Sequence, residues 1–290
     1  MHRRAYRCLV PIVAIAALGL VGCATRASLP PVAPSATDVT HPGKFVWFDL
    51  LTEDVSAARG FYAEVFGWTF EDIPGDDDYV LIRSGSAAIG GLAPVDERDS
   101  DVSESLWLGS LSVADVDAAA SVVKRRGGEL IVSPVDVDGR GRLAAVRDPA
   151  GAPLVLLRAS GGDPPDANPP VGGWLWVDLW TDDATAAKAF YAELVGYETR
   201  KVEAGRDHVY HVLGRDGRAR AGLVEIDMKG IEPNWLPYVR VADVGRTLER
   251  AREQGGSVLL QREDLGILID PTGAAIGVQR HSAIDARSGS

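Results

Sequence analysis

Cysteine is almost absent from this sequence, which has only Cys8 and Cys23 among its 290 residues. Cys8 lies in a segment that we expect to be removed on export, so the mature protein keeps one cysteine. A single cysteine cannot form an intramolecular disulfide or supply a cysteine-based metal site. The sequence thus excludes a disulfide-stabilised scaffold and a cysteine-ligated metal centre.

Positive charge is also scarce. The chain has 30 Lys and Arg against 41 Asp and Glu, and its formal net charge is −11. Residues 1–22 contain three arginines and no acidic residue, so the mature protein is more acidic still. Such a chain repels phosphate backbones, which excludes nucleic acid as an expected partner. The sequence also lacks a phosphate-binding loop, a Gly-x-Ser-x-Gly elbow and a His-Glu-x-x-His helix.

The N-terminal apolar run is too short to span a membrane. Leu9–Leu20 is apolar except for one proline and one glycine, whereas a spanning helix needs about 20 residues. A basic stretch precedes the run, and Leu20-Val21-Gly22-Cys23 follows it. This arrangement resembles a bacterial lipobox. The resemblance implies that residues 1–22 are a lipoprotein signal peptide and that Cys23 is acylated. The alternative is an ordinary signal peptide in which Cys23 has no role.

A lipobox implies export and attachment to a membrane, because two or more acyl chains hold a protein there stably. Residue 24 is alanine rather than aspartate. In a Gram-negative cell this residue resembles a sorting signal for the outer membrane, where the protein would face the periplasm. Residues 23–40 are rich in Ala, Pro, Ser and Thr, so we expect a flexible, lipid-anchored tether there.

The rest of the chain is a duplication. Trp47–Asp54 matches Trp176–Asp183 at an offset of 129 residues, whereas Asp148-Pro149 matches Asp270-Pro271 at an offset of 122. The preceding match, at Gly256, has an offset of 128, so the second copy has lost six residues after this glycine. We therefore expect its last hairpin to be shorter.

The duplication predicts domains at 41–158 and 173–282, joined by a Pro- and Gly-rich linker at 159–172 and followed by a tail at 283–290. Within each half, a strand, an Asp-capped helix and three β-like runs occur twice. The sequence therefore predicts an α+β fold of four βαβββ modules.

These modules resemble those of the vicinal oxygen chelate (glyoxalase/bleomycin-resistance/dioxygenase) superfamily. The resemblance rests on Asp54, Phe61-Tyr62 and Gly67-Trp68, on their counterparts in the second copy, and on Asp148-Pro149 before the closing strand. It implies that modules pair into two domains, each with a curled mixed sheet around a cleft and helices outside.

The resemblance also implies positions for metal ligands, and this sequence departs from it at each of them. Metal-dependent members carry His or Glu where this chain has Trp47, Leu108, Val155 and Gly90-Gly91 in the first domain, and Trp176, Leu236, Gly277 and Gly222 in the second. Indole, alkyl chains and glycine offer no atom that coordinates a metal. We therefore expect neither a metal nor another cofactor.

Aromatic and acidic side chains remain to line the clefts. Alternation along the first strand of each domain places a tryptophan and an aspartate on the cleft face. We further expect aligned tyrosines to contribute phenols and tryptophans of the second modules to form opposite walls. Such a site suits a flat or cationic small molecule. The expected ligand-binding residues are Trp47, Asp49, Tyr79, Trp107, Trp176, Asp178, Trp180, Tyr210 and Trp235.

Four functions stay open, and the sequence favours a binder over an enzyme. The first is a metal-independent small-molecule binder at a membrane surface. The second is a metal-free enzyme with Asp49 or Asp178 as general base. The third is a structural lipoprotein whose clefts are closed by their own side chains, each Asp being neutralised by an arginine; Arg83, Arg142 and Arg147 are available in the first domain. The least favoured is a metal-dependent lyase or dioxygenase.

Overall fold

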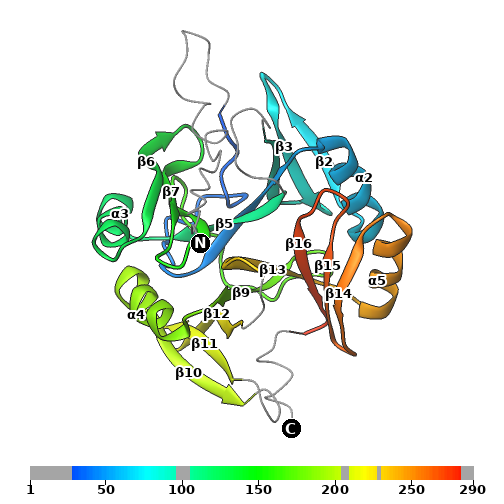
Figure 1. Cartoon of the computed structure of the whole chain (residues 1–290). Helices are drawn as coiled ribbons and strands as arrows, with labels where there is room; N and C mark the ends of the chain where they lie inside the picture. The colour runs from blue at the N-terminus through cyan, green and yellow to red at the C-terminus, as the bar shows by residue number, and fades with distance from the viewer. Residues whose placement is uncertain (1–27, 96–104, 204–208, 227–229, 282–290) are drawn as a thin grey trace, which may run out of the picture.

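The computed structural model of the chain describes residues 28–95, 105–203, 209–226 and 230–281 (Figure 1). The expected signal peptide, Cys23 and the tail at 283–290 lie outside these ranges. Within them, no helix is long and apolar enough to cross a membrane.

Domain 1 consists of two βαβββ modules. The first comprises β1 (Phe45–Thr52), α2 (Val55–Phe66), β2 (Thr69–Ile73), β3 (Asp76–Ser84) and β4 (Ala87–Pro94). The second comprises β5 (Leu106–Ser112), α3 (Val116–Arg125), β6 (Glu129–Val137), β7 (Gly141–Arg147) and β8 (Pro153–Ala159).

Domain 2 repeats this order, which confirms the predicted α+β fold of four modules. Its first module comprises β9 (Trp174–Thr181), α4 (Ala184–Val195), β10 (Glu198–Glu203), β11 (Val209–Arg215) and β12 (Arg218–Glu225). Its second comprises β13 (Asn234–Arg240), α5 (Val244–Glu253), β14 (Ser257–Gln261), β15 (Leu265–Ile269) and β16 (Ala275–Gln279).

Each domain forms one eight-stranded mixed sheet. The strand orders are β2-β3-β4-β1-β5-β8-β7-β6 and β10-β11-β12-β9-β13-β16-β15-β14, so the two topologies are the same. The first strands of the two modules lie side by side and antiparallel at the centre, as β1 with β5 and β9 with β13. Strands β6 and β7 have nine and seven residues, whereas β14 and β15 have five each. The six-residue loss has therefore shortened this hairpin, as predicted.

The repeated Asp and Gly residues define the ends of the first helix in each domain. The side chains of Asp54 and Asp183 accept hydrogen bonds from backbone amides in the first turn, which otherwise lack partners. Gly67 and Gly196 end these helices with φ of 71°, a left-handed conformation that favours glycine.

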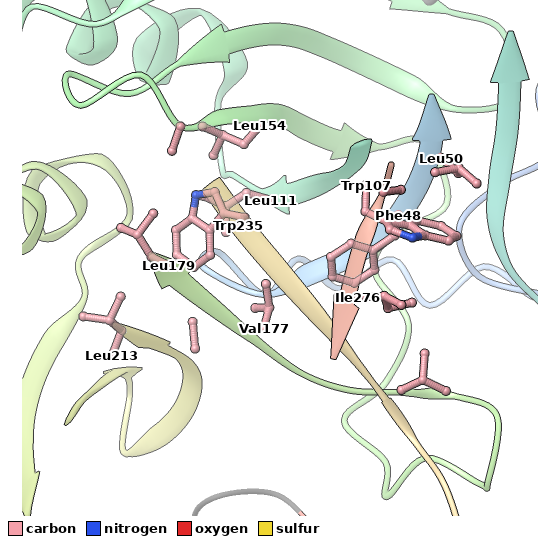
Figure 2. Close-up of a cluster of buried hydrophobic side chains, with 14 of the residues drawn as sticks. Phe48, Leu50, Trp107, Leu111, Leu154, Val177, Leu179, Leu213, Trp235 and Ile276 are labelled. Carbon is pink, nitrogen blue, oxygen red and sulfur yellow. The ribbon is translucent and has the colours of Figure 1, made fainter. Parts of the chain in front are cut away.

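The helix-covered faces of the two sheets share one hydrophobic core. Figure 2 shows Trp107 of domain 1 and Trp235 of domain 2 within it, beside aliphatic residues of both sheets. Helix α2 lies against α5, and α3 against α4, so each helix pair joins the two domains (Figure 1). The helix-covered faces thus form one core, while each cleft face keeps a smaller buried cluster of its own.

Two buried hydrogen bonds reinforce this junction. The Tyr62 hydroxyl of α2 donates to Asp270 of domain 2 at 2.8 Å, and the Tyr191 hydroxyl of α4 donates to Asp148 of domain 1 at 2.9 Å. The Phe-Tyr and Asp-Pro motifs that carry the family resemblance thus meet across the domain boundary.

The expectation of a flexible tether is wrong for its described part, residues 28–40. Leu29 and Val32 are each only 5% exposed and pack on the cleft side of domain 1. The Leu29 amide donates to the Asp138 carbonyl, and the Thr37 amide donates to the Gly161 carbonyl. The few apolar side chains of this segment pack into the cleft and anchor it there.

Candidate functional site

A hydrogen-bonded group of three side chains occupies the cleft of domain 1. The Tyr79 hydroxyl donates to Asp49 Oδ1 at 2.6 Å. The Trp47 indole nitrogen lies 2.9 Å from Asp49 Oδ1 and 3.1 Å from the Tyr79 hydroxyl, so it donates toward both oxygens. All three side chains are buried. We call this arrangement the Trp–Asp–Tyr triad.

Domain 2 repeats the triad at the corresponding positions. The Tyr210 hydroxyl donates to Asp178 Oδ1 at 2.7 Å. The Trp176 indole nitrogen lies 2.9 Å from Asp178 Oδ1 and 2.7 Å from the Tyr210 hydroxyl. The structure therefore brings together the Trp, Asp and Tyr residues that the sequence placed in each cleft.

Trp180 and Tyr238 complete the polar and aromatic lining in domain 2. Trp180 lies two residues beyond Asp178 on β9 and shares its face. The Tyr238 side chain is buried beside Asp178, where it favours the charged form of the carboxyl group and so lowers its pKa. Sequence reasoning missed Tyr238, because its counterpart in the duplication is Ser110 and no aligned aromatic drew attention to it.

The expectation that Trp107 and Trp235 form cleft walls is wrong. Trp107 pairs with Leu50, and Trp235 pairs with Leu179, so both share the face that packs under the helices. Their indole nitrogens donate to Tyr62 and Tyr191 at 2.9 Å in the shared core (Figure 2). Alternation within one strand does not give its register against the next, and a register shift of one residue reverses the face.

The cleft of domain 1 contains a cation that sequence reasoning did not identify. Arg140 lies in the turn between β6 and β7, is 4% exposed, and places its guanidinium carbon 4.3 Å from the centre of the Trp47 ring. It also donates to the Tyr79 hydroxyl at 3.2 Å. Burial raises the pKa of Asp49, and Arg140 opposes this rise by favouring the charged carboxylate. The sequence feature that could have revealed this arginine is the Gly-Arg-Gly hairpin turn, which domain 2 lacks.

The arginines that the sequence offered as partners of Asp49 have other partners. Arg83 bonds to Glu71, Arg142 bonds to Asp117 and Asp136, and Arg147 donates to a backbone carbonyl. These three arginines belong to strands, whereas Arg140, which favours the charged form of Asp49 electrostatically, belongs to a turn at the cleft.

Residues of the N-terminal segment close the cleft of domain 1. Leu29 and Val32 pack with Trp47, Tyr79 and other cleft residues in one buried cluster. The cavity that remains beside Leu29, Asp49 and Arg140 has a volume of about 20 Å³. This space is large enough for a single water molecule but too small for an organic ligand.

The cleft of domain 2 differs in charge and in accessibility. Asp178 is buried, its pKa is raised chiefly by burial, and it forms no ion pair within the described part of the chain. Trp176 and Trp180 are half-buried, whereas Trp47 is 1% exposed. The triad is thus covered in domain 1, where Arg140 favours the charged Asp49, whereas in domain 2 the tryptophan is partly exposed and Asp178 has no ion pair with any residue that the structure describes.

The residues at the family's metal positions do not fit a metal ion. A side chain at Gly91 would place its Cβ 1.9 Å from the Tyr79 hydroxyl oxygen, and one at Gly222 would place it 2.0 Å from the Tyr210 hydroxyl oxygen. A Cβ at Gly277 would lie 2.2 Å from the Tyr238 ring. The triads and Tyr238 therefore fill the space that glutamates would need. Among the described residues, no group of three or more His, Cys, Asp or Glu could hold a metal.

Comparisons with known proteins agree with this architecture. A family model described as bleomycin resistance protein-like N-terminal matches residues 44–85. The putative glyoxylase CFP32 of Mycobacterium tuberculosis is 30% identical over 241 residues, covering 80% of this chain and 92% of that protein. The anthracycline biosynthesis protein DnrV of Streptomyces peucetius is 31% identical over 258 residues, covering 82% and 93%.

Solved structures share the fold at low sequence identity. A Mn(II)-bound glyoxalase from Novosphingobium aromaticivorans has a TM-score of 0.57 and 14% identity, covering 83% of this chain and 82% of that chain. An extradiol ring-cleaving dioxygenase from B. fuscum has a TM-score of 0.58 and 15% identity, covering 87% and 74%. With the tandem βαβββ modules and full-length relatives at about 30% identity, the chain belongs to the vicinal oxygen chelate (glyoxalase/bleomycin-resistance) superfamily, as a tandem pair of glyoxalase-like domains.

Proposed function

We propose that this protein is a metal-independent binder of a small, flat and cationic molecule, and that the cleft of domain 2 is its binding site. The observation that carries the proposal is the difference between the two triads. Asp178 is a buried carboxylate without a cation in the described part of the chain, beside the half-buried indoles of Trp176 and Trp180. In domain 1, Arg140 already occupies the equivalent position over Trp47.

Domain 1 supplies the chemical argument for a cationic ligand. Its guanidinium lies over an indole and next to a buried carboxylate, which is a cation–π contact combined with charge compensation. Domain 2 keeps the indole and the carboxylate but has lost the hairpin turn that delivers the guanidinium. An external cation with a flat body would restore the missing contacts and would relieve the cost of a buried, uncompensated charge.

A titration with a defined probe tests this proposal. N-methylacridinium is flat and permanently charged, and acridine is its neutral analogue above pH 7. We expect the purified protein to bind the cation with at least about tenfold higher affinity than acridine, with equal affinity in the presence and absence of EDTA. Quenching of tryptophan fluorescence and calorimetry would measure the affinities for N-methylacridinium and for acridine, with and without EDTA.

Matched variants locate the site. Asp178→Asn removes the cleft charge, and we expect about tenfold weaker binding of N-methylacridinium. Asp182→Asn removes an exposed charge four residues away and should leave the affinity unchanged. Equal affinities of the two variants, or loss of binding in EDTA, would overturn the proposal. The alternative of a structural protein with closed clefts would then stand, since the covered cleft of domain 1 already fits it.

A metal-free enzyme is the second candidate, and the raised pKa of Asp178 favours it. Burial disfavours the carboxylate and makes it a stronger base, as a general base requires. The two candidates differ in what Asp178→Asn should change. An enzyme keeps much of its ligand affinity in this variant and loses turnover, whereas a binder loses affinity.

We further propose that the protein is exported and held on a membrane surface through acylated Cys23, at the outer membrane facing the periplasm if the cell is Gram-negative. The lipobox sequence supports this proposal. We expect Cys23→Ser to leave the chain unlipidated and uncleaved by the lipoprotein-specific peptidase. Mass spectrometry of the wild-type protein should find an acylated N-terminus at Cys23, and a mature N-terminus elsewhere without acyl chains would refute the assignment.

A further inference from the structure

A groove that shares Trp176 with the triad of domain 2 lies where the two domains and the linker meet. It has a volume of about 540 Å³, which is in the usual range for a small-molecule site. Its walls come from Lys44 and the start of β1, from linker residues 166–169, and from the first residues of β9 and β12. Three parts of the chain that are distant in sequence therefore build one hollow.

Three cations converge on one carboxylate in this groove. Asp166 lies 3.1 Å from Lys44 Nζ, 2.7 Å from Arg220 and 3.1 Å from Arg218. These interactions hold the pKa of Asp166 well below its usual range. One negative charge cannot balance three positive charges, so the groove keeps a positive excess although the whole chain has a net charge of −11.

The positively charged side chains of the groove can still donate hydrogen bonds to a further acceptor. The Arg220 side chain is 10% exposed, and its Nε has no hydrogen-bond partner among the described residues. Arg218 is 64% exposed at the mouth, so its guanidinium is accessible. Lys44 also faces a second carboxylate, that of Asp163. Asp163 does not line the groove, and it accepts hydrogen bonds from the Ser112 hydroxyl and the His41 amide. Burial and the neighbouring Arg220 nevertheless lower the pKa of Lys44, as expected where positive charge is incompletely compensated.

The wall beside the cations is aromatic. Phe45, Phe48 and Trp174 line the groove, and the rings of Phe48 and Trp174 pack with centroids 4.6 Å apart. The Trp174 indole nitrogen is held by the Ile89 carbonyl at 2.7 Å, which fixes the orientation of its ring. The half-buried rings of Phe45 and Trp174 offer flat apolar surface next to the guanidinium groups.

We propose that this groove binds a small organic anion with an aromatic body, whose anionic group pairs with Arg218 and Arg220 and whose ring packs against Trp174 and Phe45. Guanidinium groups bind carboxylates and phosphates through paired, charge-assisted hydrogen bonds, and an aromatic body gains from burial against the ring wall. The groove carries the opposite charge preference to the cleft of domain 2, although Trp176 belongs to both.

Calorimetric titration with 2-naphthoate tests the proposal on the purified protein. We expect 2-naphthoate to bind at one site per chain, and its neutral analogue 2-naphthamide to bind at least about tenfold more weakly. Arg218→Gln removes an exposed charge at the mouth without adding repulsion, and we expect it to lower the affinity for 2-naphthoate about tenfold. Arg246→Gln, on the exposed face of α5, is the matched control and should leave the affinity unchanged.

One further arm separates the possible outcomes. Inorganic phosphate should compete with 2-naphthoate only weakly, because it cannot use the aromatic wall. Equal binding of naphthoate and naphthamide, unchanged affinity in Arg218→Gln, or competition by phosphate as strong as that by naphthoate itself would overturn the proposal.

Discussion

Asp49→Asn should destabilise the folded protein by about 3–5 kcal/mol, because it leaves a buried guanidinium without its compensating charge. Arg140 is only 4% exposed, so bulk water cannot replace the carboxylate beside its guanidinium group. The asparagine can still accept the hydrogen bonds from Trp47 and Tyr79, so the substitution isolates the effect of charge. Urea unfolding of the two proteins at pH 7 measures the difference.

The same substitution in domain 2 should have the opposite result. Asp178→Asn removes a buried charge that has no cation in the described part of the chain, so we expect it to leave the free energy of unfolding unchanged or to raise it. Arg140→Met, added to Asp49→Asn, should recover most of the stability lost in domain 1. Equal destabilisation by the two Asp→Asn substitutions would show that the triads are electrostatically equivalent and would contradict the account.

The effect of Asp178 should depend on pH in a definite direction. Burial raises the pKa of Asp178 in the folded state above its value in the unfolded chain. The folded protein therefore binds this proton more tightly, and the stability from the protonated group is present at low pH and is lost as the pH rises through the folded pKa. The advantage of Asp178→Asn should thus be largest near pH 7 and should vanish as the pH falls toward about 4.

Gly91→Ala should also destabilise the protein, since its new Cβ would lie 1.9 Å from the Tyr79 hydroxyl oxygen and 2.4 Å from Asp49 Oδ1. Both groups are buried, so relief of the clash must disturb the triad. We expect a loss of about 1–3 kcal/mol, as for other overpacked interiors. Gly222→Ala should behave alike, because its Cβ would meet Asp178 and Tyr210 at 2.0 Å.

Gly60→Ala is the matched control for these substitutions. Gly60 is exposed within α2, and a Cβ there would have no atom within 4 Å. Alanine favours the helix by about 0.5–1 kcal/mol over glycine, so this variant should be more stable. Thermal unfolding of the three variants measures the contrast. Wild-type stability in Gly91→Ala would mean that the triad can move aside and that the metal position can accept a side chain.

The sequence predicted the modules and part of the cleft because both depend on local pattern. The Asp caps, the Phe-Tyr helices and the Asp-Pro turns repeat at nearly constant offsets, and the structure confirms four βαβββ modules. Alternation along one strand correctly placed Trp47 and Asp49 on the face opposite to Phe48 and Leu50.

The remaining features depend on how separate elements meet. Trp107 was misplaced because the register of β5 against β1 decides its face. Arg140 was missed because it reaches the cleft from a turn, where strand alternation gives no direction. Leu29 appeared to belong to a tether because a few apolar residues in a proline-rich segment indicate no structure until their complementary surface is known. Two of these features, Arg140 and Leu29, close the cleft of domain 1.

The duplication explains how one chain can hold two sites with different properties. The triads have the same geometry, so the ancestral module supplied both. Loss of six residues then removed from domain 2 the turn that carries the cation in domain 1. The copy with the turn has a covered triad beside Arg140, whereas Asp178 in the copy without it has no cation among the described residues, as the proposed function requires.

Elemental analysis of the purified protein, prepared without any exposure to chelator, tests the central claim most directly. Metal coordination needs several imidazole, thiolate or carboxylate donors together, and each cleft supplies one carboxylate that is already hydrogen-bonded to Trp and Tyr. We predict that zinc, iron, manganese and nickel are each far below one equivalent per chain. Near-stoichiometric content of one of these metals, lost on substitution of Asp49 or Asp178, would contradict the account and restore a metal-dependent activity.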